Sequence, residues 1–357
     1  MVANTSDELP FTTDKTPEEQ FRFDDPLQRT IIGLVFIPIC FTGLFGNSLV
    51  LLSVLVSRKL HTISNVFVVN LSIADLVVCM SLPSTIAQAF SPLDVRVGPD
   101  WLCALNAAVM FACIGVSVST LASISLIRAL IVTRPLAARF SRKMMTLWLT
   151  LVWLIPSTVD VLPQLLWGGE LFGYDGKYGA CMPKTSHPKI DLYKSITFLV
   201  SFPLPFLTIV ASLVVIIINL KRHSSDLVKG NTKLGKSSKT KSTSKTVPVP
   251  VSSVTVAIED NTTKLRLQRR QVQITKNMMM VVGVFFACIA PFFLIVVIPD
   301  TAPALPYLSL ITYFNSCVNP IIYAKHPNFR EIFLHILNRR WADIPKKSRF
   351  LEFFINR

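Results

Sequence analysis

Two long stretches of this chain contain no charged side chain, and they limit its fold more than any other feature. Ile196–Leu220 and Met278–Ile298 are uncharged, and a helix needs only about 20 such residues to cross the hydrocarbon layer of a bilayer. Similar apolar blocks recur along the chain, near 31–56, 66–90, 103–127, 144–167, 195–220, 278–299 and 304–324. The sequence therefore predicts an all-α membrane protein, a bundle of seven transmembrane helices.

The distribution of basic residues predicts how this bundle lies in the membrane. If the N-terminus is outside, the inner segments hold 28 of the 36 Lys and Arg residues, as basic loops tend to stay on the cytoplasmic side. Residues 1–30 then form a disordered extracellular tail, in which Asn4 begins a glycosylation sequence. Inner loops that face anionic lipid account for the net charge of +15. We therefore expect a multi-pass plasma-membrane protein with no nucleic-acid partner.

Two inner segments accompany the bundle, which we expect to extend over 31–326. The basic loop 222–273 is rich in Lys, Ser and Thr, which suits either a flexible tether or a phosphorylated segment. Residues 327–341 predict an amphipathic eighth helix on the inner membrane surface, leaving 342–357 as a cytoplasmic tail. The apolar side chains of this helix recur at helical spacing, at Phe329, Phe333, Ile336, Leu337 and Trp341.

The cysteines predict one disulfide. Five of the seven lie inside predicted spans, where a free thiol behaves as a small apolar residue. Cys103 and Cys181 are the two expected on the oxidising outer side. A bond between them would attach the second outer loop to the top of the third span.

Polar side chains inside the spans are costly and are therefore candidates for function. Asp75 in the second span is the strongest, because a carboxylate there must bind a cation or a proton. Neutral oxygens from other spans could surround it, and oxygen ligands suit a sodium ion. The alternative is a protonated Asp75 that is simply hydrogen-bonded into the bundle. The residues expected around Asp75 are Ser117, Asn315, Ser316 and Asn319.

Several short motifs, in order along the chain, resemble those of the rhodopsin-like (class A) G-protein-coupled receptors. The resemblance runs from about residue 31 to residue 341, and Cys103 with Cys181 matches the disulfide of that class. Within the class, 65–69 and 313–317 are most similar to melatonin receptors, whereas 323–330 are most similar to opsins. The motifs are Gly46-Asn47, Asn70-Leu71-Ser72-Ile73-Ala74-Asp75, Trp153, and Asn319-Pro320-Ile321-Ile322-Tyr323 followed by Phe329.

The resemblance implies where signalling residues lie. Ile127-Arg128-Ala129 stands where the class has Asp-Arg-Tyr, so Arg128, with Pro135 downstream, would contact the G protein. Because the acid that restrains this arginine is missing, we predict raised activity without ligand. Ile289 and Leu213 also replace a tryptophan and a tyrosine that act as switches in the class. The residues expected to relay activation are Val118, Pro205, Phe285, Pro291, Asn319, Pro320 and Tyr323.

The same frame predicts an apolar ligand pocket. Tyr313 occupies the position of the opsin lysine, which argues against covalent retinal, and Met110 replaces the aspartate of amine receptors. Asp160 is the charged exception: it either faces the pocket or hydrogen-bonds to the third span. The remaining lining suits a small, mostly neutral ligand and consists of Met110, Phe111, Ile114, Phe292 and Tyr313.

These observations predict a G-protein-coupled receptor for a small extracellular ligand. Its expected partners are heterotrimeric G proteins, arrestin, receptor kinases and membrane lipid. It requires no cofactor, and sodium at Asp75 is one of the two alternatives for that site. We predict no enzymatic activity, because the sequence shows no nucleophile–base pair and no set of metal ligands. The alternative, suggested by the altered switch residues, is a scavenger-type or other non-coupling protein, or a heterodimer partner.

Overall fold

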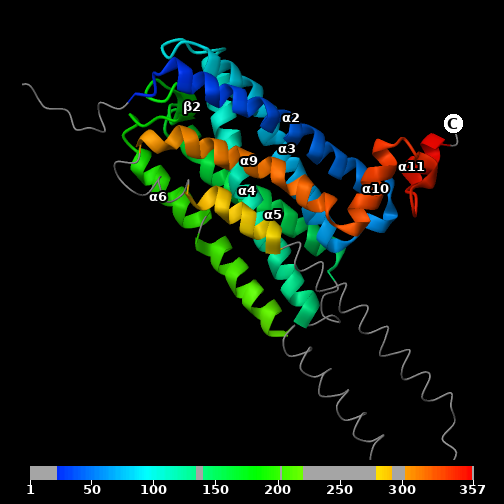
Figure 1. Cartoon of the computed structure of the whole chain (residues 1–357). Helices are drawn as coiled ribbons and strands as arrows, with labels where there is room; N and C mark the ends of the chain where they lie inside the picture. The colour runs from blue at the N-terminus through cyan, green and yellow to red at the C-terminus, as the bar shows by residue number, and fades with distance from the viewer. Residues whose placement is uncertain (1–21, 134–139, 202, 220–278, 292–301, 356–357) are drawn as a thin grey trace, which may run out of the picture.

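The computed structural model describes residues 22–133, 140–201, 203–219, 279–291 and 302–355. These residues are mostly helical, and the long helices stand side by side in one elongated bundle (Figure 1). The predicted glycosylation site Asn4 and the basic loop 222–273 lie outside the described residues.

Five helices are long and apolar enough to cross a membrane. Each covers one of the predicted spans but begins a few residues earlier, and three of them, α2, α3 and α5, begin after an N-cap side chain that accepts a backbone hydrogen bond. Asp25 Oδ1, for example, accepts a hydrogen bond from the backbone N–H of Leu27 at 2.9 Å. The five are α2 (Pro26–Val56), α3 (Ile63–Phe90), α4 (Asp100–Thr133), α5 (Arg142–Leu166) and Ile190–Asn219, which begins with α6 (Ile190–Ser201).

The sixth and seventh predicted spans correspond to shorter helices. The helix Met279–Pro291 matches the first part of the predicted sixth span, and the rest of that span lies outside the described residues. The helix α9 (Leu305–Ala324) covers the seventh span closely. In Figure 1, both run along the bundle, and α9 packs against α2 and α3.

The predicted outer tail, 1–30, extends too far into the chain. The helix α2 already begins at Pro26, and Phe23 before it is buried. The backbone N–H of Phe23 also donates to the carbonyl of Lys177 at 2.8 Å. The signal for this helix start is Asp25-Pro26, because an N-cap acid followed by proline is typical of a first helical turn. Residues 22–30 therefore belong to the folded end of the bundle that the predicted orientation makes the outer end.

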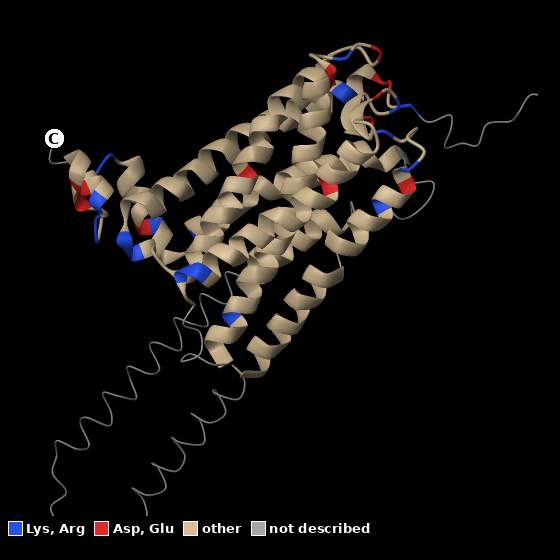
Figure 2. Ribbon diagram, turned by 180° about the vertical axis from the view of Figure 1, so that it is seen from behind, with Lys and Arg blue, Asp and Glu red and all other residues tan. Residues whose placement is uncertain are grey.

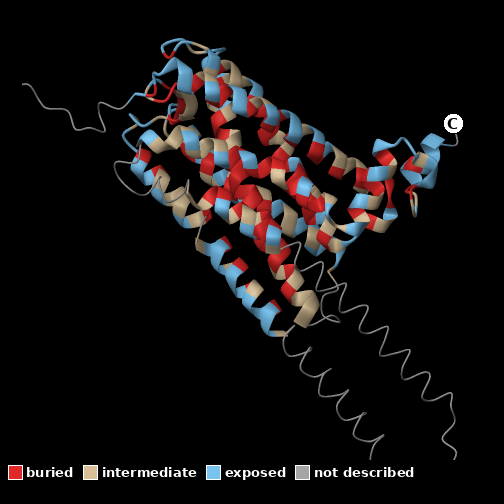
Figure 3. Cartoon of the chain, viewed as in Figure 1, coloured by how far each residue is buried: buried red, intermediate tan, exposed pale blue. Residues whose placement is uncertain are grey.

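The distribution of burial and charge fits a bundle surrounded by lipid. In α4, 78% of the most apolar window is buried, against 17% in α5, so α4 is central and α5 is peripheral. Exposed leucines such as Leu147, Leu154 and Leu165 cover the side of α5 that faces away from the bundle. Figure 3 shows buried residues on the facing sides of the helices, and Figure 2 shows that most charged residues lie at the two ends, with a few acidic residues inside the bundle. A wide apolar belt between two charged ends is what a membrane-spanning bundle requires.

The outer end carries a β-hairpin that is attached to the bundle by a disulfide. The strands β1 (Phe172–Asp175) and β2 (Ala180–Pro183) pair antiparallel, with Tyr174 opposite Cys181. Cys181 is bonded to Cys103 on the first turn of α4, as the sequence predicted. The five other cysteines are buried and free. The disulfide holds the hairpin over the outer end of the bundle.

The inner end is formed by two further helices, α10 (Pro327–Leu337) and α11 (Arg349–Ile355). The predicted amphipathic helix 327–341 is shorter than expected, since Trp341 lies in a separate 3₁₀ turn. The buried face of α10 includes Phe329 and Phe333 and packs against α2 and α9, whereas Leu337 is exposed. Most of the apolar face that the sequence assigned to lipid therefore contacts the protein. The position of α10 at a membrane surface stays a prediction.

Candidate functional site

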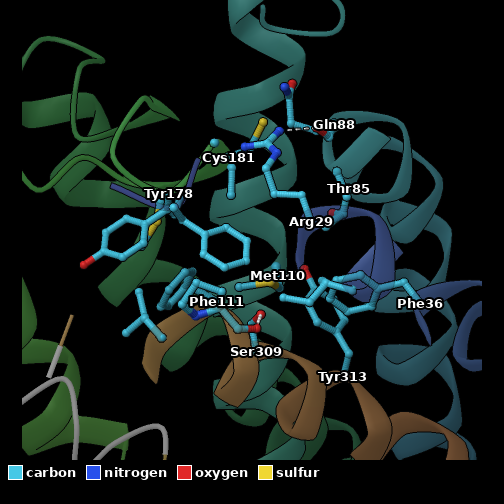
Figure 4. Close-up of a pocket in the computed structure, with 18 residues that line it drawn as sticks. Arg29, Phe36, Thr85, Gln88, Met110, Phe111, Tyr178, Cys181, Ser309 and Tyr313 are labelled. Carbon is cyan, nitrogen blue, oxygen red and sulfur yellow. Dashed lines mark hydrogen bonds between the residues drawn. The ribbon is translucent and has the colours of Figure 1, made fainter. Parts of the chain in front are cut away.

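A cavity of about 110 Å³ lies at the outer end of the bundle, beneath the β-hairpin. It is enclosed by the outer ends of α2, α3, α4 and α9, with residues of the hairpin as its cover (Figure 4). Its lining is mainly aromatic and apolar, which is typical of sites for small molecules. The apolar lining residues include Phe23, Ile32, Phe36, Ala89, Met110, Phe111, Tyr178, Met182, Leu305 and Tyr313.

Three of the predicted pocket residues line this cavity, namely Met110, Phe111 and Tyr313. Tyr313 donates a hydrogen bond to the sulfur of Met110, and its ring packs edge-on against Phe36 with centroids 5.2 Å apart. Ile114 does not line the outer cavity. It lies deeper, in the wall of a second and smaller cavity, because it is one helical turn further into the membrane than Met110.

Two further pocket predictions have different outcomes. Phe292 lies outside the described residues. Asp160 does not line the cavity and is fully buried between helices, where Tyr193 Oη of α6 donates to its Oδ1 at 2.7 Å. Its Oδ2 has no hydrogen-bond partner among the described residues. The expected hydrogen bond to the third span was wrong, because the tyrosine comes from α6.

The charged residue in the wall of the outer cavity is Arg29, which lies in the segment that was predicted to be a disordered tail. Its side chain is 4% exposed, and Nη2 donates to the carbonyl oxygens of Gln88 and Ser91, each at 2.8 Å. Figure 4 shows it above Met110 and Tyr313, beside Gln88 and Cys181. Hydrophobicity alone could not reveal Arg29, since it precedes the first apolar block.

The residues predicted around Asp75 come together in the middle of the bundle. Asn319 Nδ2 donates to Asp75 Oδ2 at 2.9 Å, and both residues are buried. Asp75 shares the small second cavity with residues from α4 and α9, so oxygen atoms from three helices converge there. The predicted residues in its wall are Ser117, Asn315 and Ser316.

Hydrogen bonds between helices hold this polar centre in place. Asn47 of α2 donates to the carbonyl of Ser316 at 2.9 Å. Asn70 donates to Thr120 Oγ1 at 2.8 Å and accepts from Trp153 Nε1 at 2.8 Å. These polar residues therefore form cross-links between α2 and α9 and among α3, α4 and α5. Buried hydrogen bonds between helices help to fix one arrangement of a bundle.

The outer cavity and the Asp75 cavity share part of their walls. Met110 and Tyr313 line both, and they are hydrogen-bonded to each other. Ile289, at the position of the family's tryptophan switch, lines the second cavity from the helix Met279–Pro291. A molecule in the outer cavity would therefore touch side chains that also enclose Asp75.

The predicted relay residues continue from there toward the inner end. Val118, Phe285 and Tyr323 belong to one buried hydrophobic cluster with Ile289, and Leu213 packs against it. Pro205 is buried and Pro291 is half-buried, each within a helix. Pro320 lies in α9, between Asn319 and Tyr323. Val118, Phe285 and Tyr323 thus share one buried cluster with Phe329 of α10 at the inner end.

The predicted G-protein contact lies in the last turns of α4. Arg128 is half-buried, and Pro135 lies outside the described residues. Ile127, at the position of the class's acid, is fully buried and packs in the same hydrophobic cluster as Phe285. Ile127 therefore places an apolar side chain where the class has the carboxylate next to this arginine.

Comparisons with known proteins agree with this arrangement. The sequence model of the family described as "7 transmembrane receptor (rhodopsin family)" matches residues 46–323. An alpha-1A adrenergic receptor of Oryzias latipes is 29% identical, over 87% of this chain and 67% of the relative. Melanin-concentrating hormone receptor 1 of Mus musculus is 28% identical, over 86% and 82%.

The overall fold is likewise similar to a solved structure. Squid rhodopsin superposes with a TM-score of 0.70 at 18% identity, covering 89% of this chain and 87% of that one. At this level of identity the likeness concerns the fold alone. It supports the seven-helix arrangement.

Proposed function

Because the chain belongs to the rhodopsin family of seven-transmembrane receptors, we propose that a small ligand in its outer cavity activates heterotrimeric G proteins at its inner end. The observation that carries the proposal is the shared wall of Met110 and Tyr313 between the outer cavity and the Asp75 cavity. A ligand that moves these side chains changes the space around Asp75 and the cluster beneath it. Packed cores have discrete arrangements, so such a shift can bias the whole bundle.

The nature of the ligand is the least constrained part of this proposal. The relatives named above are receptors for chemically different ligands, so their names transfer none of them to this chain. The apolar lining suits a small molecule with a mostly apolar body. The absence of a lysine at Tyr313 and of an aspartate at Met110 argues against retinal and amines. The expectation of a mostly neutral ligand did not take Arg29 into account.

The other parts of the proposal concern the site at Asp75 and the orientation. Oxygen atoms of Asp75, Ser117 and Asn315 around one small cavity suit a sodium ion, with protonation of Asp75 as the alternative. We place the N-terminus outside the plasma membrane, so that Cys103–Cys181 faces the oxidising side. Arrestin and receptor kinases are further proposed partners at the inner end.

A second candidate function is a seven-helix protein that does not couple to G proteins, as a scavenger or heterodimer partner. Ile127, Leu213 and Ile289 favour it, because each replaces a switch residue of the class. Against it, Arg128 and the motif Asn319-Pro320 are present, and the buried path between cavity and inner end is continuous. We therefore give priority to the coupling receptor.

Basal signalling in cells tests the proposal. We expect cells that express the receptor to show altered second-messenger levels without ligand, because Ile127 stands where the class has the acid that precedes this arginine. Ile127→Asp should reduce this signal, roughly tenfold if the new carboxylate gains one charge-assisted bond. Ile127→Ala, which adds no acid, is the control, and surface expression is measured for all three. A receptor with no signal in any second-messenger pathway would favour the non-coupling candidate.

A further inference from the structure

The guanidinium of Arg29 is buried, charged and only partly hydrogen-bonded. It projects from the first turn of α2 into the wall of the outer cavity. Nη2 makes two hydrogen bonds to backbone carbonyls, but Nη1 has no hydrogen-bond partner among the described residues. A buried charge is costly unless it is paired and hydrogen-bonded. Arg29 therefore lacks both a countercharge and one acceptor.

Three acidic residues at the outer end are engaged elsewhere. Asp94 forms an ion pair with Arg22, and Asp100 forms one with Arg96. The oxygens of Asp175 accept hydrogen bonds from the N–H of Lys177 and from the backbone and side chain of Thr185. None of the ion pairs within the described part of the chain includes Arg29.

The tyrosine that interacts electrostatically with Arg29 cannot supply the negative charge either. Tyr174 donates its hydroxyl hydrogen to the carbonyl of Leu93, so it is protonated in this arrangement. Burial raises the pKa of Tyr174 above its ordinary value, which keeps it neutral at physiological pH. The countercharge must therefore come from a group outside the described chain.

The guanidinium is held in place by the fold. The side chain of Gln88 donates to the carbonyl of Val95 at 2.7 Å and accepts from the N–H of Val97 at 2.8 Å, which fixes the outer end of α3 that Arg29 binds. Gly179, with φ +61°, lies directly against Nη1, and a Cβ there would clash with it. The hairpin thus reaches the arginine only because this residue is glycine.

We propose that the ligand of the outer cavity is a small organic acid, whose carboxylate accepts a hydrogen bond from Arg29 and whose apolar body lies against Met110, Phe111 and Tyr313. This inference rests on the proposed function and specifies the ligand class for the same cavity. Guanidinium and carboxylate match in geometry and charge, and the bond is stronger than one between neutral groups. The rest of the lining supplies little polar contact, so the carboxylate would orient the ligand.

Binding of matched acids and neutral analogues to the purified full-length receptor in lipid nanodiscs tests this. The probes are octanoate, 3-phenylpropanoate and indole-3-propanoate, each with its primary amide and its primary amine, and affinities follow from ligand-dependent thermal stabilisation. We expect at least one acid to bind the wild type roughly tenfold more tightly than its amide, and the amines to bind least. Equal binding of acid and amide, or no binding by any acid, would overturn the proposal.

Variants at two arginines locate the effect. Arg29→Gln should remove the preference for acid over amide, whereas Arg29→Lys, which keeps the positive charge, should retain part of it. Arg22→Gln is the matched control, because Arg22 pairs with Asp94 at the same end of the molecule, and it should bind as the wild type does. An acid preference that survives in Arg29→Gln would contradict the assignment. If the Arg29 variants do not fold, the comparison of acids with amides on the wild type still decides.

The assay separates this inference from the proposed function, because it contains no G protein. Acids that bind through Arg29 to a receptor without signalling would leave the inference standing and overturn G-protein coupling. If the receptor signals but binds acids and amides equally, G-protein coupling would stand and the inference about the acid would be overturned.

Discussion

The Asp75 cavity and the outer cavity share a wall but are built in different ways. Around Asp75, the polar side chains come from the interiors of α3, α4 and α9 and from motifs with fixed spacing. The outer cavity also uses chain that lies outside the helix interiors, such as Phe23 and the hairpin residues Tyr178 and Met182. The helices alone therefore fix the Asp75 cavity, whereas the outer cavity depends on segments that fold back over the helices.

Removal of the disulfide should have the largest effect, and this effect should concern the outer cavity rather than the Asp75 cavity. We expect Cys103→Ser with Cys181→Ser to lower the free energy of unfolding by about 2–5 kcal/mol, because the bond closes a long loop over a sequence separation of 78 residues. Ligand binding in the outer cavity should be lost. Thermal unfolding of the purified receptor measures the first effect, and binding of the acid probes measures the second.

A free cysteine supplies the control for this prediction. Cys113 is buried in the same helix as Cys103 and forms no disulfide, so Cys113→Ser should leave probe binding close to that of the wild type. Unchanged probe binding in the double variant would show that the hairpin keeps its place without the covalent bond, and the contrast between the two cavities would fail.

Close helix packing beneath the Asp75 cavity should give the next largest effect. A Cβ at Gly46 would lie 2.7 Å from Cβ of Pro320, so Gly46→Ala must push α2 and α9 apart. We expect a loss of about 1–3 kcal/mol in the free energy of unfolding. Gly283→Ala is the matched control, since nothing lies within 4 Å of the added carbon, and it should be neutral or slightly stabilising. Equal effects of the two substitutions would refute close packing at Gly46.

The hydrogen bond between Tyr193 and Asp160 tests whether Asp160 is structural. Tyr193→Phe leaves a buried carboxyl group without its donor, which should cost about 1–3 kcal/mol of stability. Probe affinity should not change, because Asp160 does not line the outer cavity. Tyr307→Phe removes an exposed hydroxyl that bonds Gln28 and should have little effect on stability. A large change in probe affinity in Tyr193→Phe would instead assign Asp160 to the ligand.

Sodium binding at Asp75 should give the smallest effect on stability. If the ion binds there, a tenfold excess of sodium over its dissociation constant stabilises the receptor by about 1.4 kcal/mol. The unfolding temperature of the wild type should therefore rise when sodium replaces choline at constant ionic strength. We expect no such rise for Asp75→Asn, which keeps the size of the side chain without its charge. The same response in both proteins would favour a protonated Asp75.

These two cavities also show how far the sequence could predict the structure. The cost of polar side chains inside apolar spans predicted the group around Asp75, because such residues need polar partners within the bundle. Asp160 was recognised as unusual, but its partner Tyr193 depended on how α6 is turned against α5, which periodicity does not give. Arg29 was missed because the apolar block begins after it. Asp25-Pro26 was the available sign that the helix starts earlier.

The inner end shows the same limit. Helical spacing predicted a helix after residue 326, and α10 begins there. Spacing alone could not distinguish an apolar face turned to lipid from one turned to protein. In the structure Phe329 stacks on Tyr323, with ring centroids 5.7 Å apart, so this face completes the bundle.

The most direct test of the central claim, that this chain is a coupling receptor, is guanine-nucleotide exchange by purified heterotrimeric G proteins added to membranes that contain it. The wild type is compared with Arg128→Ala and with Arg142→Ala, an exposed basic residue at the same end of the bundle. We predict exchange above that of empty membranes for the wild type and for Arg142→Ala, and its loss in Arg128→Ala. Exchange equal to that of empty membranes with every G protein, or exchange that is unchanged in Arg128→Ala, would contradict the claim.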